Sequence, residues 1–362
     1  MVALNVLGAV LLVAGFGAAW RAGRERPGTP TAAWHPDPSE YFPQSRWWDS
    51  RAWTARVRPA DFAADRGRRF HGRFRGSWAW LVLGAVAVFA AGSVAYAATG
   101  SVHVMAAASF LAMTGAGWAF YRFTARQLAL DDVIGWPAVI AVAVATAGVV
   151  LLVAAHANRA ILDAGGVRTA TAAVGFVEEG TKLLIPIGLF LIGRYRDPRA
   201  GIAIGLAAGF GFAITETTKY AYTTANASGP DLCGAAAGVP TVAEVIQAQA
   251  YRIVGVSPLH WLWTGIATAV AWRLWHLYGR HRTPATIGAI LLVMVIHSAN
   301  DMSATLDCDN AGVSGLGQLF RWAVLIAMYL VFKAMARKST PPPLIGVVSK
   351  GWIPRRLRTT TH

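Results

Sequence analysis

Charged residues are scarce in this chain. They make up 14% of its 362 positions, against about 25% in a typical soluble domain. Hydrophobic residues make up 55%, so the composition excludes an ordinary soluble globular protein and indicates a membrane protein. The mean hydropathy of +0.43 is modest for that class, which indicates that a sizeable soluble insert accompanies the apolar segments.

Several short enzyme motifs are also missing. The chain has no glycine-rich phosphate loop, no Gly-x-Ser-x-Gly elbow and no cysteine cluster with metal-ligand spacing, so nucleotide hydrolysis and serine-type hydrolysis have no support. Acidic residues are outnumbered, 18 against 33 Lys and Arg, which gives a net charge of +15. The arginines fall in short gaps between apolar stretches, as in cytoplasmic loops, and we therefore expect no nucleic-acid partner.

Long apolar runs are plentiful. A helix needs about 20 apolar residues to cross the hydrocarbon core of a bilayer, and about nine runs qualify, which predicts an all-α polytopic fold. The expected spans are Val2–Trp20, Ser77–Ala98, Val102–Phe120, Val133–His156, Ala172–Ile192, Ala200–Tyr222, Val256–Tyr278, Pro284–Ser303 and Leu319–Ala336.

Basic residues predict the orientation of these spans, because cytoplasmic loops collect Lys and Arg. Alternate gaps hold 26 of the 33, and these gaps are 21–76, 121–132, 193–199, 279–283 and 333–362. The amino terminus is therefore expected outside and the carboxyl terminus inside. No positive charge precedes the first run and arginines follow it, so residues 1–20 are interpreted as a transmembrane anchor rather than a cleaved secretory signal.

A tryptophan-rich stretch fills most of residues 30–60. Four tryptophans could supply a miniature core there, with a pair of strands closed by the Pro36-Asp37-Pro38 turn. It resembles a small Trp-rich domain of actinobacterial membrane proteins and is expected in the cytoplasm, although a solvated linker is the alternative. Residues 61–76 form a basic linker, and Arg66 to Arg75 favour anionic lipid at the cytoplasmic face.

Two cysteines, Cys233 and Cys308, lie in gaps that the charge rule places outside the cytoplasm. A disulfide between them is chemically permitted there. Sequence alone does not establish that their separation suits the bond, so a disulfide and two unpaired thiols both remain open.

Ionisable side chains inside a bilayer cost at least about 2.5 to 3.5 kcal/mol each on insertion scales, so those in the fifth to eighth spans require an explanation. Six of them, all except Lys182, converge on the outer halves of antiparallel spans, which predicts one polar layer open to the outer side. The fifth span places Lys182 one turn after an acidic pair. The residues are Glu178, Glu179, Lys182, Glu216, His260, His297 and Asp301.

These residues fall in four motifs that resemble those of the PrsW family, relatives of the CAAX-processing intramembrane proteases. The motifs are Glu178-Glu179-Gly-Thr-Lys182, Gly-Phe-Gly-Phe212-Ala-Ile-Thr-Glu216, Ser-Pro-Leu-His260 and His297-Ser-Ala-Asn-Asp301. The resemblance covers about residues 130 to 335. It implies an intramembrane endopeptidase that cuts membrane-associated proteins near the outer face of a bacterial plasma membrane, as one family member cuts an anti-sigma factor.

By position, Glu178 would be the carboxylate that activates water, with Glu179, Lys182 and Phe212 in support. Glu216 stands where the CAAX relatives have His, which follows the PrsW pattern. His260 and His297 could hydrogen-bond the oxyanion, with Asp301 orienting His297 or holding water.

A metal interpretation uses the same residues. His260, His297 and Glu216 would give two imidazoles and one carboxylate with a free position for water, as in a catalytic site for a divalent cation such as Zn²⁺. The residues alone leave the metal-dependent and metal-free mechanisms open. The rival functions are a proton- or ion-coupled transporter and a catalytically silent scaffold.

The resemblance also completes the expected organisation of the chain. Residues 77–336 form the membrane-embedded helical protease domain. Residues 337–362 form a basic cytoplasmic tail.

Overall fold

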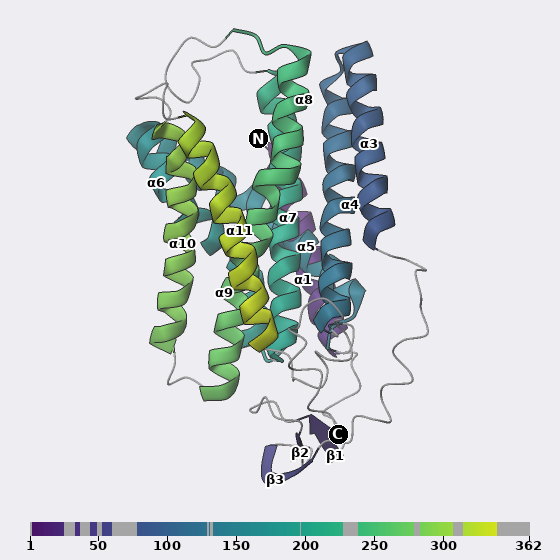
Figure 1. Ribbon diagram of the computed structural model, residues 1–362, viewed down its shortest axis with the longest axis vertical. Helices are drawn as coiled ribbons and strands as arrows, with labels where there is room; N and C mark the ends of the chain where they lie inside the picture. Colours follow the sequence, from purple (N-terminus) through teal and green to yellow (C-terminus); the bar gives the residue numbers. More distant parts are fainter. Residues whose placement is uncertain are drawn as a thin grey trace.

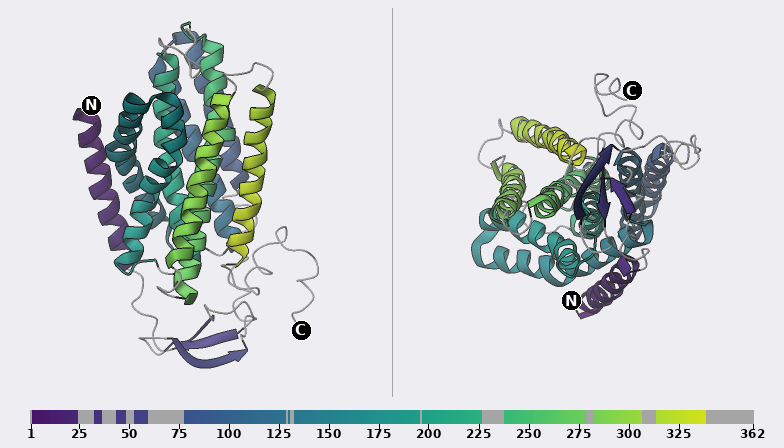
Figure 2. Two further views of the ribbon diagram at one scale, coloured as in Figure 1. Left: turned by 90° about the vertical axis from the view of Figure 1, so that its left-hand side faces the viewer. Right: turned by 90° about the horizontal axis from the view of Figure 1, so that it is seen from below.

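The protein is a bundle of long helices with a small sheet beyond one end, as the computed structural model shows (Figures 1 and 2). Its helices are α1 (Val2–Arg24), α3 (Trp78–Thr99), α4 (Val102–Leu128), α5 (Trp136–Val149), η2 (Val150–Ala154), α6 (Ala155–Leu191), α7 (Pro198–Ala225), α8 (Val242–Tyr251), η3 (Arg252–Val256), α9 (Ser257–Tyr278), α10 (Thr283–Leu306) and α11 (Ser314–Lys338), where η marks a π-helix. The structure describes residues 2–24, 33–36, 44–48, 53–59, 78–128, 130, 133–195, 197–226, 238–278, 283–306 and 314–338.

Eight helices in the described part of the chain are long and apolar enough to cross a membrane. One of them, Trp136–Leu191, has 56 residues and contains two of the expected spans. It bends at Gly166, whose φ of 72° and ψ of −178° lie in a region essentially restricted to glycine. The multi-pass membrane fold predicted from the sequence is therefore confirmed.

The seventh expected span begins earlier than the sequence indicated. The sequence predicts a start at Val256, but α8, η3 and α9 form one continuous helix, and its segment Val242–Trp275 is long and apolar enough to cross a membrane. Its start is fixed by a capping box, in which Thr241 and Glu244 exchange hydrogen bonds. The extension brings Arg252 into the helix, one π-turn before Ser257.

Hydrogen bonds place the ends of α1, α9 and α11 together with Tyr195, which lies between α6 and α7. Tyr195 donates its hydroxyl to the carbonyl of Ala19 and accepts the indole N–H of Trp272 at its own carbonyl. Arg273 donates to the carbonyl of Lys338. All these residues adjoin basic gaps of the sequence. The hydrogen bonds therefore place these basic gaps at the same end of the bundle, as the charge pattern predicts. Which side of the membrane this end faces stays a prediction.

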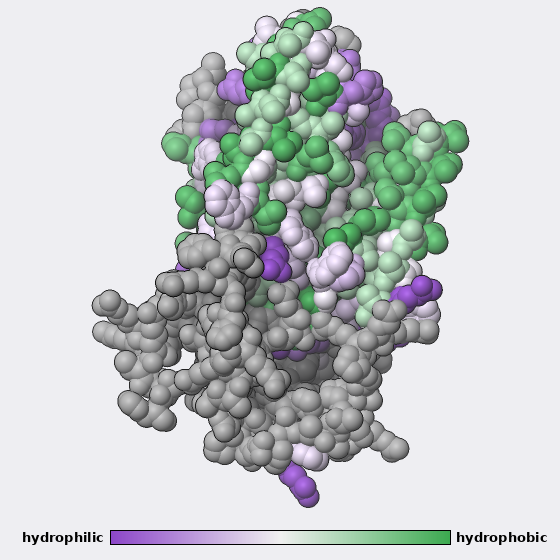
Figure 3. Space-filling model, turned by 90° about the vertical axis from the view of Figure 1, so that its right-hand side faces the viewer, coloured by the Kyte–Doolittle hydropathy of each residue, from purple (hydrophilic) through white to green (hydrophobic). Residues whose placement is uncertain are grey.

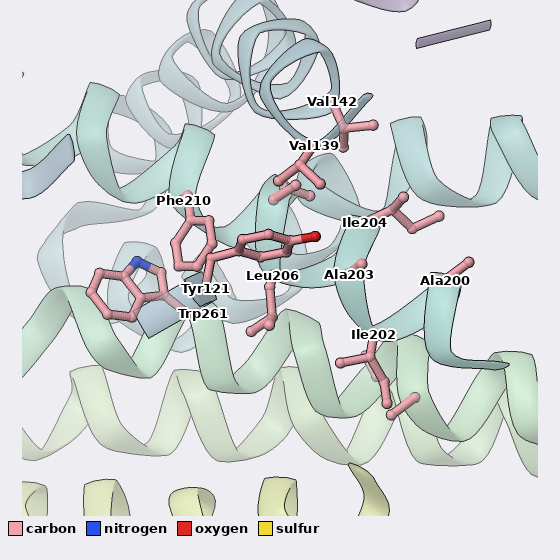
Figure 4. Packing of buried hydrophobic residues seen from close by; sticks show 14 of the residues in the cluster. Tyr121, Val139, Val142, Ala200, Ile202, Ala203, Ile204, Leu206, Phe210 and Trp261 are labelled. Atoms are coloured by element: carbon pink, nitrogen blue, oxygen red, sulfur yellow. The ribbon is translucent and has the colours of Figure 1, made fainter. Parts of the chain in front are cut away.

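The core is centred on α7 and α9, which pack closely along their length. A side chain at Gly201 or Gly205 would collide with Trp272 or Thr268 of α9, and one at Gly209 would lie 2.8 Å from the carbonyl oxygen of His260. Around this contact, Tyr121, Phe210 and Trp261 pack together (Figure 4). The small residues of α7 thus bring its backbone against the start of α9.

Apolar side chains also cover the outside of the bundle. On α3, Trp80 is 68% and Val94 71% exposed, and Figure 3 shows apolar residues spread over the helical part of one face. An outer surface of this kind is suited to lipid rather than water.

The Trp-rich stretch forms a three-stranded antiparallel sheet in the order β1 (Ala33–Pro36), β2 (Gln44–Trp48) and β3 (Trp53–Pro59). Trp34 pairs with Trp47 between β1 and β2. The expected strand pair is thus present, and the structure adds a third strand. The basic linker 61–76, nearly all of the tail 337–362, Cys233 and Cys308 lie outside the described residues.

Candidate active site

Four helices bring the predicted polar residues together. α6 supplies Glu178, Glu179 and Lys182, α7 supplies Glu216, α9 supplies His260, and α10 supplies His297 with Asp301 at its rim. Glu179, Lys182 and His297 are fully buried, whereas the Asp301 side chain is 35% exposed. The structure therefore brings these groups together, while their common depth near the outer side of the membrane stays a prediction.

Glu179 is the fixed carboxylate of the site. Its Oε1 accepts from Lys182 Nζ at 2.6 Å and lies 3.0 Å from His297 Nδ1. Its Oε2 accepts from the hydroxyl of Thr264, one turn after His260, at 2.9 Å. Because a carboxylate only accepts, His297 carries a proton on Nδ1 and presents Nε2 to the rest of the site.

His260 is oriented from both sides. Its Nδ1 lies 2.9 Å from Lys182 Nζ, and its Nε2 lies 2.9 Å from Glu216 Oε2. An ammonium only donates, so Nδ1 accepts, and a neutral imidazole then has its proton on Nε2, facing Glu216. Phe212 packs against both partners, with its ring 3.9 Å from Lys182 Nζ and 4.8 Å from the His260 ring.

Arg252 belongs to the site although the sequence analysis did not select it. Its Nη2 lies 2.7 Å from Glu216 Oε2, within ion-pair distance but without hydrogen-bond geometry. Its guanidinium also lies over the Tyr220 ring at 3.5 Å. The only sequence signal is a lone arginine four residues before Val256, outside the expected span.

Glu178 is the carboxylate with an available oxygen. Its Oε1 accepts from Asn158 Nδ2 at 3.2 Å. Its Oε2 makes no hydrogen bond to the described residues and lies 3.6 Å from His297 Nε2 and 3.9 Å from Lys182 Nζ. Among the described residues, therefore, Glu178 has an oxygen free for a water molecule, while both oxygens of Glu179 are engaged.

His297 is held by stacking as well as by Glu179. Its ring lies 3.9 Å from the Trp263 ring at an interplanar angle of 21°. Asp301 Oδ2 is 3.8 Å from His297 Nε2, too far for a hydrogen bond, and Asp301 Oδ1 accepts from Asn300. Asp301 thus lies next to His297 without fixing it.

The carboxylate that the structure groups with the two histidines differs from the one that the sequence predicted as a metal ligand. Glu178, not Glu216, groups with His260 and His297, and the three offer ligand atoms within 4.8 Å of one another. Glu216 instead lies beside Arg252, and that positive charge makes it a poorer ligand for a cation.

The chemistry of this group fits a divalent cation. Glu178 Oε2, His260 Nε2 and His297 Nε2 are buried and make no hydrogen bond among the described residues. Two imidazoles and one carboxylate are the donor set of several catalytic zinc sites. Glu179 holds the other nitrogen of His297, as the outer carboxylate of such sites does. Binding at His260 would displace the Nε2 proton.

Fold and site together define a polytopic membrane protein with a buried acid–histidine centre, suited to hydrolysis. Residues 132–335 match the family described as the PrsW family intramembrane metalloproteases. Since the match covers more than half of the chain, the protein belongs to this family and is an intramembrane protease. No curated protein and no solved structure matches the chain.

Proposed function

We propose that this protease hydrolyses peptide bonds of membrane-associated proteins near the outer face of a bacterial plasma membrane, with Glu178 activating the water. Regulators of the anti-sigma-factor type are the substrate class we expect. The observation that supports Glu178 is its unpaired, buried Oε2 beside His297 Nε2. A water that contacts both atoms could lose its proton to Glu178 and attack the substrate carbonyl.

The other residues supply the remaining requirements of amide hydrolysis. The Nε2–H of His260, held by Lys182 and facing Glu216, can donate to the developing oxyanion. The protonated Glu178 can then return its proton to the departing amine. In the metal-dependent alternative, Glu178, His260 and His297 would hold a divalent cation, and its Lewis acidity would take the place of the His260 Nε2–H toward the carbonyl oxygen.

Replacement of Glu178 by Gln tests this function. Glu178→Gln keeps the size and the acceptor for Asn158 but removes the base. New amino termini in the membrane proteome that appear with the wild-type protein should disappear with this variant at equal protein abundance. Asp163→Asn, at a side chain 54% exposed on α6, is the matched control and should behave as wild type. Unchanged cleavage with Glu178→Gln would exclude Glu178 as the base.

A further inference from the structure

Among the described residues, Asn158 is the one polar side chain outside the four motifs that lies within hydrogen-bond distance of Glu178. It lies on α6, 20 residues before Glu178, and donates from Nδ2 to Glu178 Oε1 at 3.2 Å. Oε2 is the oxygen left facing His297. The amide therefore engages one carboxylate oxygen and turns the other toward the rest of the site.

Three local features bring Asn158 to this position. The π-helix η2 (Val150–Ala154) precedes Asn158. The wider turn of a π-helix changes the direction, about the helix axis, in which the following side chains point. The non-helical Gly166 interrupts the helix between Asn158 and Glu178, which lets the two side chains meet although 20 residues of straight helix would separate them by about 30 Å. His156 Nε2 lies 2.8 Å from Asn5 Oδ1 of α1, which holds the segment two residues before Asn158.

We infer that Asn158 is a positioning residue for the proteolytic reaction, which holds Glu178 with Oε2 directed at the water and the histidines. The inference rests on the proposed role of Glu178 as base. Asn158 acts through Glu178 and touches neither substrate nor the reacting atoms. A carboxylate that loses this donor can rotate away from the productive geometry, and misplacement of a catalytic group by about 1 Å costs about 100-fold in rate.

The kinetic experiment compares Asn158→Ala and Asn158→Leu with the wild type on a purified membrane reporter that carries a cleavage site mapped with Glu178→Gln. We expect kcat to fall about 10- to 100-fold with KM within about twofold, because substrate binding does not involve Asn158. Arg159→Gln is the matched control on the same segment, since this side chain is 70% exposed, and should keep the wild-type kcat. A wild-type kcat for both Asn158 variants would overturn the inference.

A stability cycle tests the contact without any substrate. Asn158→Asp sets one carboxylate against another and should lower the thermal midpoint, whereas the double variant Asn158→Asp/Glu178→Gln exchanges donor and acceptor and should restore it. Activity should remain absent in the double variant, because the base is gone. Strictly additive midpoint shifts would show that the two side chains do not interact. Absence of cleavage by the wild-type protein would refute the proposed function and leave this cycle interpretable.

Discussion

Lys182 shows how single residues make this site tolerable inside a membrane. Its ammonium is fully buried, donates to Glu179 at 2.6 Å and lies 2.9 Å from His260 Nδ1. A buried ion pair is weak evidence for net stability, but removal of one partner leaves an uncompensated charge. Lys182 thus links the fixed carboxylate of α6 to the histidine of α9.

We expect Lys182→Met to destabilise the protein by about 3 to 5 kcal/mol, because Glu179 then keeps a buried charge without its cation. The thermal midpoint in detergent measures the effect. Adding Glu179→Gln should recover part of the loss. Lys219→Met removes an exposed lysine of α7 and should leave the midpoint unchanged. Equal midpoints for the two single lysine variants would contradict the role assigned to Lys182.

At this scale the acidic and histidine members of the site could be predicted, because an ionisable group inside an apolar run is conspicuous. The roles of Asn158, Arg252 and Thr264 in the site could not be predicted from the sequence. Thr264 is an ordinary residue of a membrane helix until Glu179 is seen to accept from it. The choice between Glu178 and Glu216 as metal ligand depends on helix rotation, which the sequence does not contain.

Among the elements, α1 shows most clearly how glycine sets helix spacing. A Cβ at Gly15 would lie 2.8 Å from the carbonyl oxygen of Ala141 and would collide with the backbone of Ala145. Gly8 of α1 and Gly148 of α5 make a second close contact, seven residues before Gly15 on α1. This packing against α5 supports the interpretation of the first span as a structural helix.

Gly15→Leu should therefore destabilise the bundle, by about 1 to 3 kcal/mol for an overpacked contact. Gly17→Leu is the matched control, because a Cβ at Gly17 meets nothing within 4 Å. Thermal midpoints of the two variants in the same detergent measure the difference. If both variants melt together with the wild type, α1 does not depend on this close contact.

The existence of the spans could be predicted because hydrophobic length is a strong signal, and the part of α6 after Gly166 contains nearly all of the expected span Ala172–Ile192. The bend at Gly166 and the π-helix η3 could not be predicted from the sequence. A glycine does not by itself specify a bend, and an arginine before an apolar run does not specify a π-helix. These two irregularities bring Asn158 and Arg252 to the site.

For the whole molecule, the clustering of basic residues near one end of the bundle predicts the orientation. With the carboxyl terminus in the cytoplasm, a fluorescent protein fused after His362 should fluoresce in intact cells. Alkaline phosphatase at the same point should be inactive. The opposite pattern would place the site near the inner face and would contradict the proposed side of cleavage.

The closeness of α6 and α10 restricts how a substrate can enter. The amide of Gly175 donates to Ser298 Oγ at 3.1 Å, and a Cβ at Gly175 would overlap the carbonyl oxygen of Met294. No extended peptide can pass between two backbones in such contact. The scissile segment of a substrate would therefore have to reach Glu178 by a route other than this contact between α6 and α10.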